Sequence, residues 1–198
     1  MMQKRTLTSL LLISFLVAFA FSYALGQDEV VFDEINTARC NTAGVVNITV
    51  NSSVDLSAVE LVFTISKDDA PFTSYTVDWD PAFTALGTRF GPFIYPGTDY
   101  DTVRMAAIKI ATTDTDLPAT PTQVVKIDFE AGDFCEGQVL FDNAVLDGGI
   151  PAVVTTKLVE AAGNTVIPVT VVPGSVTYVN SPPVLDPIAN VTVPWGDP

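Results

Sequence analysis

The chain has 198 residues, with 23 acidic side chains against 9 basic ones and no histidine, and its formal net charge is −14. So few Lys and Arg residues exclude nucleic acid as a partner, because phosphate backbones are bound by clusters of basic side chains. The lack of histidine excludes Ser-His-Asp triads, Cys-His dyads and His-ligated zinc. A hydrophobic content of 48% with only 16% charged residues excludes a disordered chain and predicts a folded core.

Residues 1–26 have the three-part pattern of a secretory signal peptide. Two basic residues precede an apolar run over 7–21, and small residues allow cleavage after Ala24 or Gly26. The run is shorter than the roughly 20 apolar residues that a transmembrane helix needs. We therefore expect a secreted or cell-surface protein with no membrane insertion after cleavage. Removal of this segment takes away two basic side chains and no acidic one, so the net charge becomes −16.

The sequence has two cysteines, Cys40 and Cys135. In an exported protein an isolated pair is most simply one disulfide, and the alternative is two free buried thiols. The disulfide would close a loop of about 95 residues, which the chain-entropy model values at about 4 to 5 kcal/mol. It would tie the first part of the domain to a late strand.

From residue 28 to 180, short runs alternate between apolar and polar residues and are separated by segments rich in Gly, Pro, Asp and Asn. The clearest runs are 46–50, 59–65, 75–79 and 125–129, and further strands are expected over 29–36, 90–95, 102–111, 138–146, 152–158, 165–171 and 174–179. No sustained helical period occurs, although 81–86 has room for one helical turn. This pattern predicts an all-β sandwich or jelly roll.

Residues 181–198 differ from the preceding region. They begin with a proline-rich stretch, which is typical of an extended linker, and continue with one short apolar run. This ending resembles the opening of immunoglobulin-like or cadherin-like repeats in bacterial surface proteins. We therefore expect a linker followed by the first strand of a truncated immunoglobulin-like domain.

The region over 28–180 resembles the cohesin family. The resemblance is carried by a strand and polar turn over 45–59, a strand and Asp-Pro-x-aromatic corner over 63–83, and strands over 124–130, 139–147 and 173–179. It implies a nine-stranded jelly-roll β-sandwich related to carbohydrate-binding modules. Members of this family bind dockerin modules noncovalently and mount enzymes on scaffolds or cell surfaces.

For a cohesin-like binder, we expect contact with the partner through the flat polar face of one sheet. By alternation, the side chains that project outward there are Ser74, Thr76, Asp78, Lys126, Asp128 and Glu130. An ordinary solvated face would have the same pattern, so that alternative stays open.

Four aromatic residues, Phe90, Phe93, Tyr95 and Tyr100, cluster around Pro92 and Pro96. If exposed, they could anchor a protein partner, and Phe93, Tyr95 and Tyr100 could stack on the sugar rings of a polysaccharide. We favour packing over the end of the sandwich, because soluble domains rarely expose several large aromatic side chains together. Trp79 alternates with apolar neighbours, so we expect it in the core.

Two pairs of aspartates, Asp78 with Asp80 and Asp99 with Asp101, have the spacing of carboxylates on one face. Paired carboxylates serve as acid and nucleophile in glycosidases, and they also bind Ca²⁺. A solvated polar surface with turn-forming aspartates is the favoured interpretation, because a full set of calcium ligands in one loop is missing. No cofactor is expected, and Ca²⁺ is the one ion that we consider.

These observations favour a secreted, non-catalytic, cohesin-like module that docks a dockerin-type partner in an extracellular scaffold or surface assembly. A carbohydrate-binding module and a structural spacer or adhesin domain remain as alternatives. An enzyme is not expected, because the chain has no histidine, no credible nucleophile and no glycine-rich phosphate loop.

Overall fold

The computed structural model describes residues 28–39, 42–67, 72–131, 137–147 and 153–179. In this part of the chain, all regular structure is β-strand. The strands are β1 (Glu29–Phe32), β2 (Glu34–Arg39), β3 (Ala43–Asn51), β4 (Leu56–Ser66), β5 (Phe72–Trp79), β6 (Thr88–Tyr95), β7 (Tyr100–Ile108), β8 (Thr122–Ala131), β9 (Gly137–Asn143), β10 (Val145–Leu146), β11 (Val154–Thr155), β12 (Lys157–Glu160), β13 (Val166–Ile167), β14 (Thr170–Val172) and β15 (Gly174–Val179). Every run predicted as a strand overlaps one or two of them.

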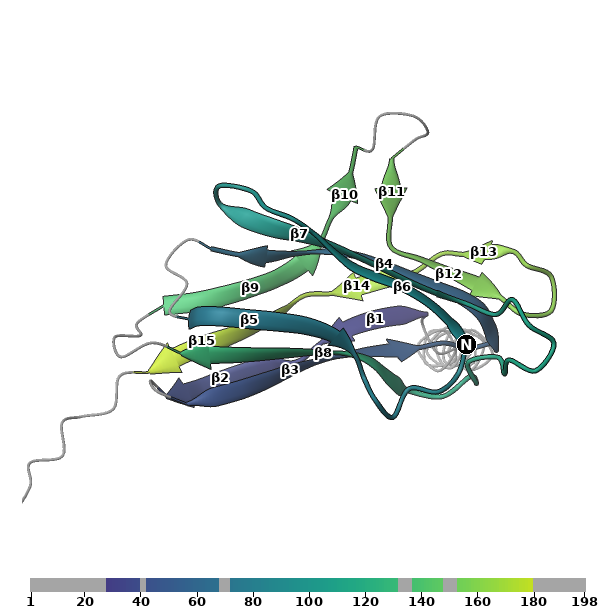
Figure 1. Ribbon diagram of the computed structural model, residues 1–198, viewed down its shortest axis with the longest axis horizontal. Helices are drawn as coiled ribbons and strands as arrows, with labels where there is room; N and C mark the ends of the chain where they lie inside the picture. The colour runs from purple at the N-terminus through teal and green to yellow at the C-terminus, as the bar shows by residue number, and fades with distance from the viewer. Residues whose placement is uncertain (1–27, 40–41, 68–71, 132–136, 148–152, 180–198) are drawn as a thin grey trace, which may run out of the picture.

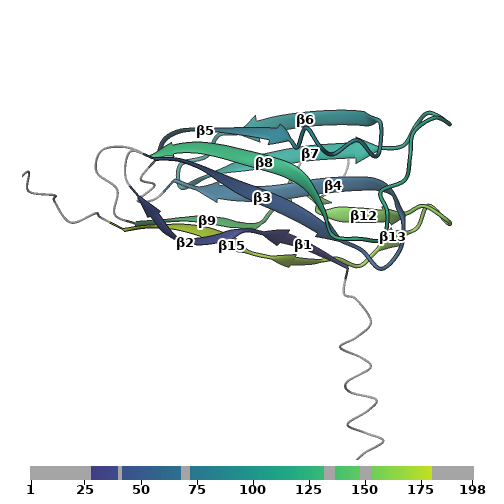
Figure 2. The same cartoon turned by 90° about the horizontal axis from the view of Figure 1, so that it is seen from below.

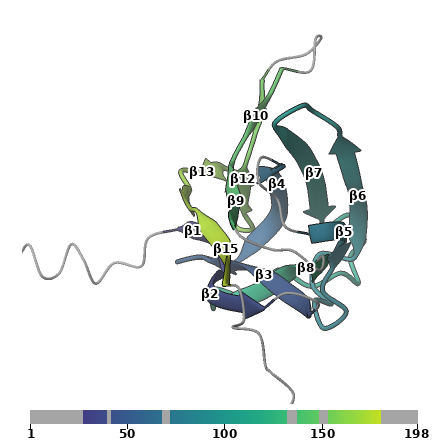
Figure 3. The same ribbon diagram turned by 90° about the vertical axis from the view of Figure 1, so that its left-hand side faces the viewer.

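The predicted all-β sandwich is confirmed. The smaller sheet has the order β14-β1-β3-β8-β5, and the larger sheet contains β13-β12-β4-β9-β15-β2 with β7 and then β6 on the other edge of β4. Seen end-on, β3 and β8 lie on one side of the interior, and β4 and β7 lie on the other (Figure 3). A separate hairpin, β10–β11, projects from the body of the domain (Figure 1).

The predicted count of nine strands is not confirmed. The described residues contain fifteen strand segments, because single residues interrupt several longer runs. Asp33 separates β1 from β2, Ala144 separates β9 from β10, and Thr156 separates β11 from β12. Each interruption redirects the chain to a different neighbouring strand.

The core lies between the two sheets and follows the two-residue period of the strands. In β4, Leu61, Phe63 and Ile65 are buried against the opposite sheet, while the residues between them face outward or pack laterally. Aromatic rings from three strands meet there, with ring centroids 5.3 Å apart for Phe32 and Phe63 and 6.2 Å apart for Phe32 and Phe141. This interior supplies most of the driving force for folding, because burial of apolar side chains is the dominant favourable term.

Trp79 packs against this core, as its alternation predicted, and its ring stacks on that of Phe83 at 5.6 Å. The segment 81–86 forms a turn and not a helical turn. The Phe83 amide donates to the Asp80 carbonyl at 3.0 Å, and the Ala82 amide donates to the Asp80 carboxylate at 2.6 Å. The Asp80 carboxylate therefore satisfies the Ala82 amide, and the Asp80 carbonyl closes the turn by accepting from the Phe83 amide.

Two segments change sheets side by side. The chain passes from β1 to β2 at Asp33 and from β14 to β15 at Pro173. β1 pairs with β14 in the smaller sheet, β2 pairs with β15 in the larger sheet, and both pairs are parallel. Gly174 lies at this crossing, where an added Cβ would overlap the Asp33 carbonyl oxygen and lie 2.5 Å from the Phe32 Cβ. Only glycine allows the two backbones to approach so closely.

Several expectations lie outside the described residues. These are the signal peptide over 1–26, the linker and strand over 181–198, and both cysteines, Cys40 and Cys135. In the described part of the chain, no helix has the length and hydropathy needed to cross a bilayer.

Replacement of Gly174 by Ala is expected to destabilise the domain by about 1 to 3 kcal/mol, because the clash is with backbone atoms that cannot move aside. Gly163→Ala is the matched control, since its Cβ would meet a side-chain oxygen of Thr165 at 3.1 Å, which can rotate away. Urea unfolding of both variants measures the difference. Equal stability of the two variants would contradict the close approach.

We propose, as the sequence predicts, that Cys40 and Cys135 form a disulfide. β2 ends with Arg39 opposite Val179, and β9 begins with Gly137 opposite Tyr178, so the two strand ends flank β15. Alkylation of the exported protein before reduction should label no cysteine, and reduction should lower the free energy of unfolding by about 4 to 5 kcal/mol. Labelling of both thiols in the unreduced protein would refute the pairing.

Candidate docking faces

The structure brings the six residues of the predicted polar face together on the outer side of the smaller sheet. In the antiparallel register of β5 and β8, Ser74 is opposite Glu130, Thr76 is opposite Asp128, and Asp78 is opposite Lys126. Lys126 forms an ion pair with Asp128 at 2.7 Å, and the Ser74 hydroxyl lies 3.5 Å from the Glu130 carboxylate. We call these six residues the polar face. Its charged groups partly satisfy one another.

The four aromatic residues are exposed, so the expectation that they pack over the sandwich end is wrong. The exposed fractions are 47% for Phe90, 50% for Phe93, 45% for Tyr95 and 50% for Tyr100. The physical reason is the position of β6. It is an edge strand that, among the described residues, pairs only with β7, and its outer side meets no second layer.

The register of β6 places Phe90, Phe93 and Tyr95 on one face. Tyr100 of β7 lies on the same side, because it is four residues from Arg104 along that strand. Phe90 is opposite Ala106, Phe93 is opposite Arg104, and Tyr95 is opposite Thr102, with an irregularity between Phe90 and Phe93. Without that irregularity Phe90 and Phe93 would point to opposite sides, because they are three residues apart. Gly91 allows it, with φ of 87° and an added Cβ only 2.7 Å from the Arg104 carbonyl oxygen.

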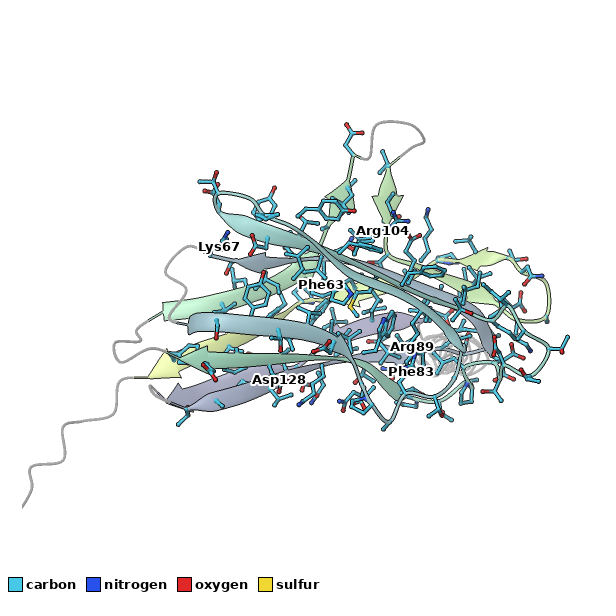
Figure 4. The ribbon with its side chains drawn as sticks, viewed as in Figure 1. Phe63, Lys67, Phe83, Arg89, Arg104 and Asp128 are labelled. Carbon is cyan, nitrogen blue, oxygen red and sulfur yellow. The ribbon has the colours of Figure 1, made fainter. Side chains whose placement is uncertain are left out.

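Arg104 holds a fixed position among these aromatic residues. Its Nε and Nη2 both donate to one carboxylate oxygen of Glu60 on β4, at 2.9 and 2.7 Å. The side chain extends from β7 on the outer side of the larger sheet (Figure 4). We call Phe90, Phe93, Tyr95, Tyr100 and Arg104 the aromatic face.

The hairpin of β6 and β7, which carries most of the aromatic face, also has a buried carboxylate on its inner side. Asp101 is only 6% exposed, and it accepts hydrogen bonds from the Tyr75 hydroxyl at 2.6 Å, the Lys67 ammonium at 2.8 Å and the Gly97 amide at 3.3 Å. Burial alone would raise the pKa of Asp101, but these donors and the Lys67 charge outweigh it and lower the pKa. Burial and the neighbouring carboxylate raise the pKa of Tyr75.

Sequence reasoning missed this role, because it grouped Asp101 with Asp99 as a solvated or turn-forming pair. The available signal was alternation along β7. Asp101 has the same parity as Val103 and Met105, which are fully buried, so its carboxylate points into the interior.

The members of the aspartate pairs make separate contacts in the structure. In the pair of Asp78 and Asp80, the carboxylate of Asp80 accepts hydrogen bonds from the Ala82 amide and the Gln123 side chain. Asp101 is directed inward, away from solvent. Nowhere in the described residues do three potential metal-ligating side chains come together.

Comparison with known proteins gives no matching family model and no matching curated protein. Among solved structures, the sixth cohesin of scaffoldin B from Acetivibrio cellulolyticus, in complex with a mutant Cel5 dockerin, is similar over 78% of this chain and 100% of its own, with a TM-score of 0.56 and 15% identity.

The OlpA cohesin of Clostridium thermocellum, solved with Doc918, covers 78% of this chain and 100% of its own at a TM-score of 0.53 and 12% identity. The seventh ScaB type I cohesin of Pseudobacteroides cellulosolvens covers 82% of this chain and 99% of its own, with a TM-score of 0.53 and 11% identity. The described domain therefore has the cohesin fold.

Proposed function

We propose that this domain is a non-catalytic module that binds a dockerin-like protein through its aromatic face. The observation that carries this proposal is the exposure of four large aromatic side chains on one face of a strongly acidic domain. Contiguous exposed apolar surface on a soluble domain commonly marks an interaction site. Cohesins with the same fold were solved in complex with dockerins, which favours a protein partner of that class.

The chemistry of the aromatic face suits a protein partner. Tyr and Arg are enriched among the residues that contribute most to protein–protein binding. Tyr95 and Tyr100 each present an apolar ring with a polar hydroxyl, and Arg104 is already oriented by Glu60. A guanidinium fixed before binding loses little side-chain freedom when a partner arrives.

The polar face is the rival surface, and its assignment as the partner-binding site stays a prediction. Exposed charges such as those of Lys126 and Asp128 already pair with one another, and surface ion pairs contribute little to affinity. Charged groups of this kind mainly affect the rate of association and specificity. We therefore place the main docking contact on the aromatic face.

A carbohydrate-binding function is the second candidate, and it is favoured by the exposure of Phe93, Tyr95 and Tyr100. Phe93 and Tyr95 lie two residues apart on one side of a strand, which spaces their side chains by about 7 Å. A row of rings at that spacing can stack on successive sugars. A spacer or adhesin domain would use neither face for binding.

Export is part of the proposed function, because a dockerin partner would be met in an extracellular assembly. We expect the mature protein to begin at Leu25 or Gln27, after cleavage behind Ala24 or Gly26. N-terminal sequencing of the protein from the culture medium tests this. A cell-associated product that still begins at Met1 or Met2 would contradict cleavage.

Binding of purified dockerin modules, including the Cel5 dockerin and Doc918, distinguishes the two faces. We expect Phe93→Ala and Tyr95→Ala to weaken binding by at least tenfold, because buried aromatic anchors dominate such interfaces. Asp128→Ala, on the polar face, should change affinity by no more than about twofold. Calorimetry gives the dissociation constants.

The reverse result, a large loss with Asp128→Ala and none with Phe93→Ala, would assign docking to the polar face. If no dockerin module binds the unaltered domain, the protein-docking proposal fails. A glycan array with wild type and Tyr95→Ala then decides the second candidate, since a carbohydrate platform should lose its signal in the variant.

A further inference from the structure

We propose that Asp101 is the positioning residue of the aromatic face. Its buried carboxylate fixes the β6–β7 hairpin to the rest of the sandwich, so that the face is preformed before a partner binds. The consequence for binding rests on the proposed function, whereas the consequence for the order of the hairpin does not.

The three donors to Asp101 come from three different parts of the fold. Tyr75 belongs to β5 in the smaller sheet, Lys67 follows the end of β4, and Gly97 lies in the turn between β6 and β7. The Tyr75–Asp101 hydrogen bond therefore joins the hairpin to the opposite sheet. β5 and β6 lie along the same edge of the sandwich, which makes this link between the sheets short (Figure 2).

Lys67 adds a second set of contacts to the same turn. Its amide donates to the Asp99 carbonyl at 2.7 Å, and its ammonium donates to the Gly97 carbonyl at 3.1 Å as well as to Asp101. In Figure 4, Lys67 extends from the end of β4 beside this hairpin. The turn is thus held at its backbone by a side chain that Asp101 itself orients.

This arrangement matters because the turn lies between two aromatic residues of the face. Tyr95 is the last residue of β6 and Tyr100 is the first residue of β7. The hairpin stands at the edge of the sheet, where, within the described ranges, β7 alone supports β6 by backbone pairing. Hydrogen bonds to an ionised group are roughly twice as strong as neutral ones, so the Asp101 contacts are suited to hold such an edge.

A preformed face binds more tightly than a mobile one. When only a fraction of molecules has the binding-competent conformation, the apparent dissociation constant rises by the inverse of that fraction. Loss of the Asp101 contacts should therefore weaken partner binding even though Asp101 itself is buried and touches no partner.

The test uses Tyr75→Phe, which removes one hydroxyl donor and keeps the ring. Tyr178→Phe is the matched control, because the Tyr178 hydroxyl is buried and has no hydrogen-bond partner among the described residues. Amide hydrogen exchange is measured over 93–103 in the hairpin and over 43–51 in β3. We expect exchange in the hairpin to become about tenfold faster in Tyr75→Phe, with β3 unchanged, and no change in Tyr178→Phe.

Asp101→Asn should produce the same local effect, since it removes the charge that Lys67 and Tyr75 recognise. Unchanged exchange in the hairpin, or an equal increase in the hairpin and β3, would overturn the positioning role. With a dockerin that binds the unaltered domain, Tyr75→Phe should also weaken affinity by about tenfold or less. If no dockerin binds, the exchange measurement still decides whether Asp101 positions the hairpin.

Discussion

The pairing of β4 with β7 is the constraint on which the rest of the structure depends. It runs without interruption from Ala58 opposite Ile108 to Ser66 opposite Tyr100. On its other edge, β4 pairs with β12 near its start and with β9 near its end. Because alternate residues of a strand point to opposite sides, this pairing sets both faces of the larger sheet at once: Leu61, Phe63 and Ile65 form the core, and Glu60 meets Arg104 outside. A slip of the β4–β7 register by one residue would exchange the core-facing and the outward-facing side chains.

The exposure of the aromatic face follows from this constraint together with a local irregularity. The β4–β7 register sends Thr102 and Arg104 outward, and β6 then adds its own outer row beside them. The irregularity between Phe90 and Phe93 brings both rings into that row. An edge strand with such a feature is also twisted away from regular pairing, which discourages another chain from adding a strand there. Contact at this edge is thus expected through the aromatic side chains and not through addition of a further strand.

Much of the fold could be predicted from the sequence, because a two-residue period is visible wherever one side of a strand is buried. This period identified the strands, and it predicted that Ser74, Thr76 and Asp78 share one outward sheet face with Lys126, Asp128 and Glu130. The site was harder to predict. The exposure of Phe93 and Tyr95 depends on which strand stands at the edge, and neighbours in a sheet are not a local property of the sequence. The buried role of Asp101 was visible as parity with Val103, but a carboxylate spaced two residues from another is ordinarily read as a solvated pair.

The charge of the chain opposes self-association of a domain with an exposed aromatic face. Of the few cations, Lys67, Arg104, Lys109 and Lys126 form ion pairs with neighbouring acids, and Arg89 lies over the ring of Phe83 at 4.8 Å. These cations therefore serve internal structure. Among the described acids only Asp101 is buried, so the large excess of carboxylates is at least partly exposed. Copies of the domain repel one another at a distance, which opposes association through the aromatic face. A partner that binds must overcome the same field, so complementary positive charge around its apolar contact surface would favour it over a second copy of this chain.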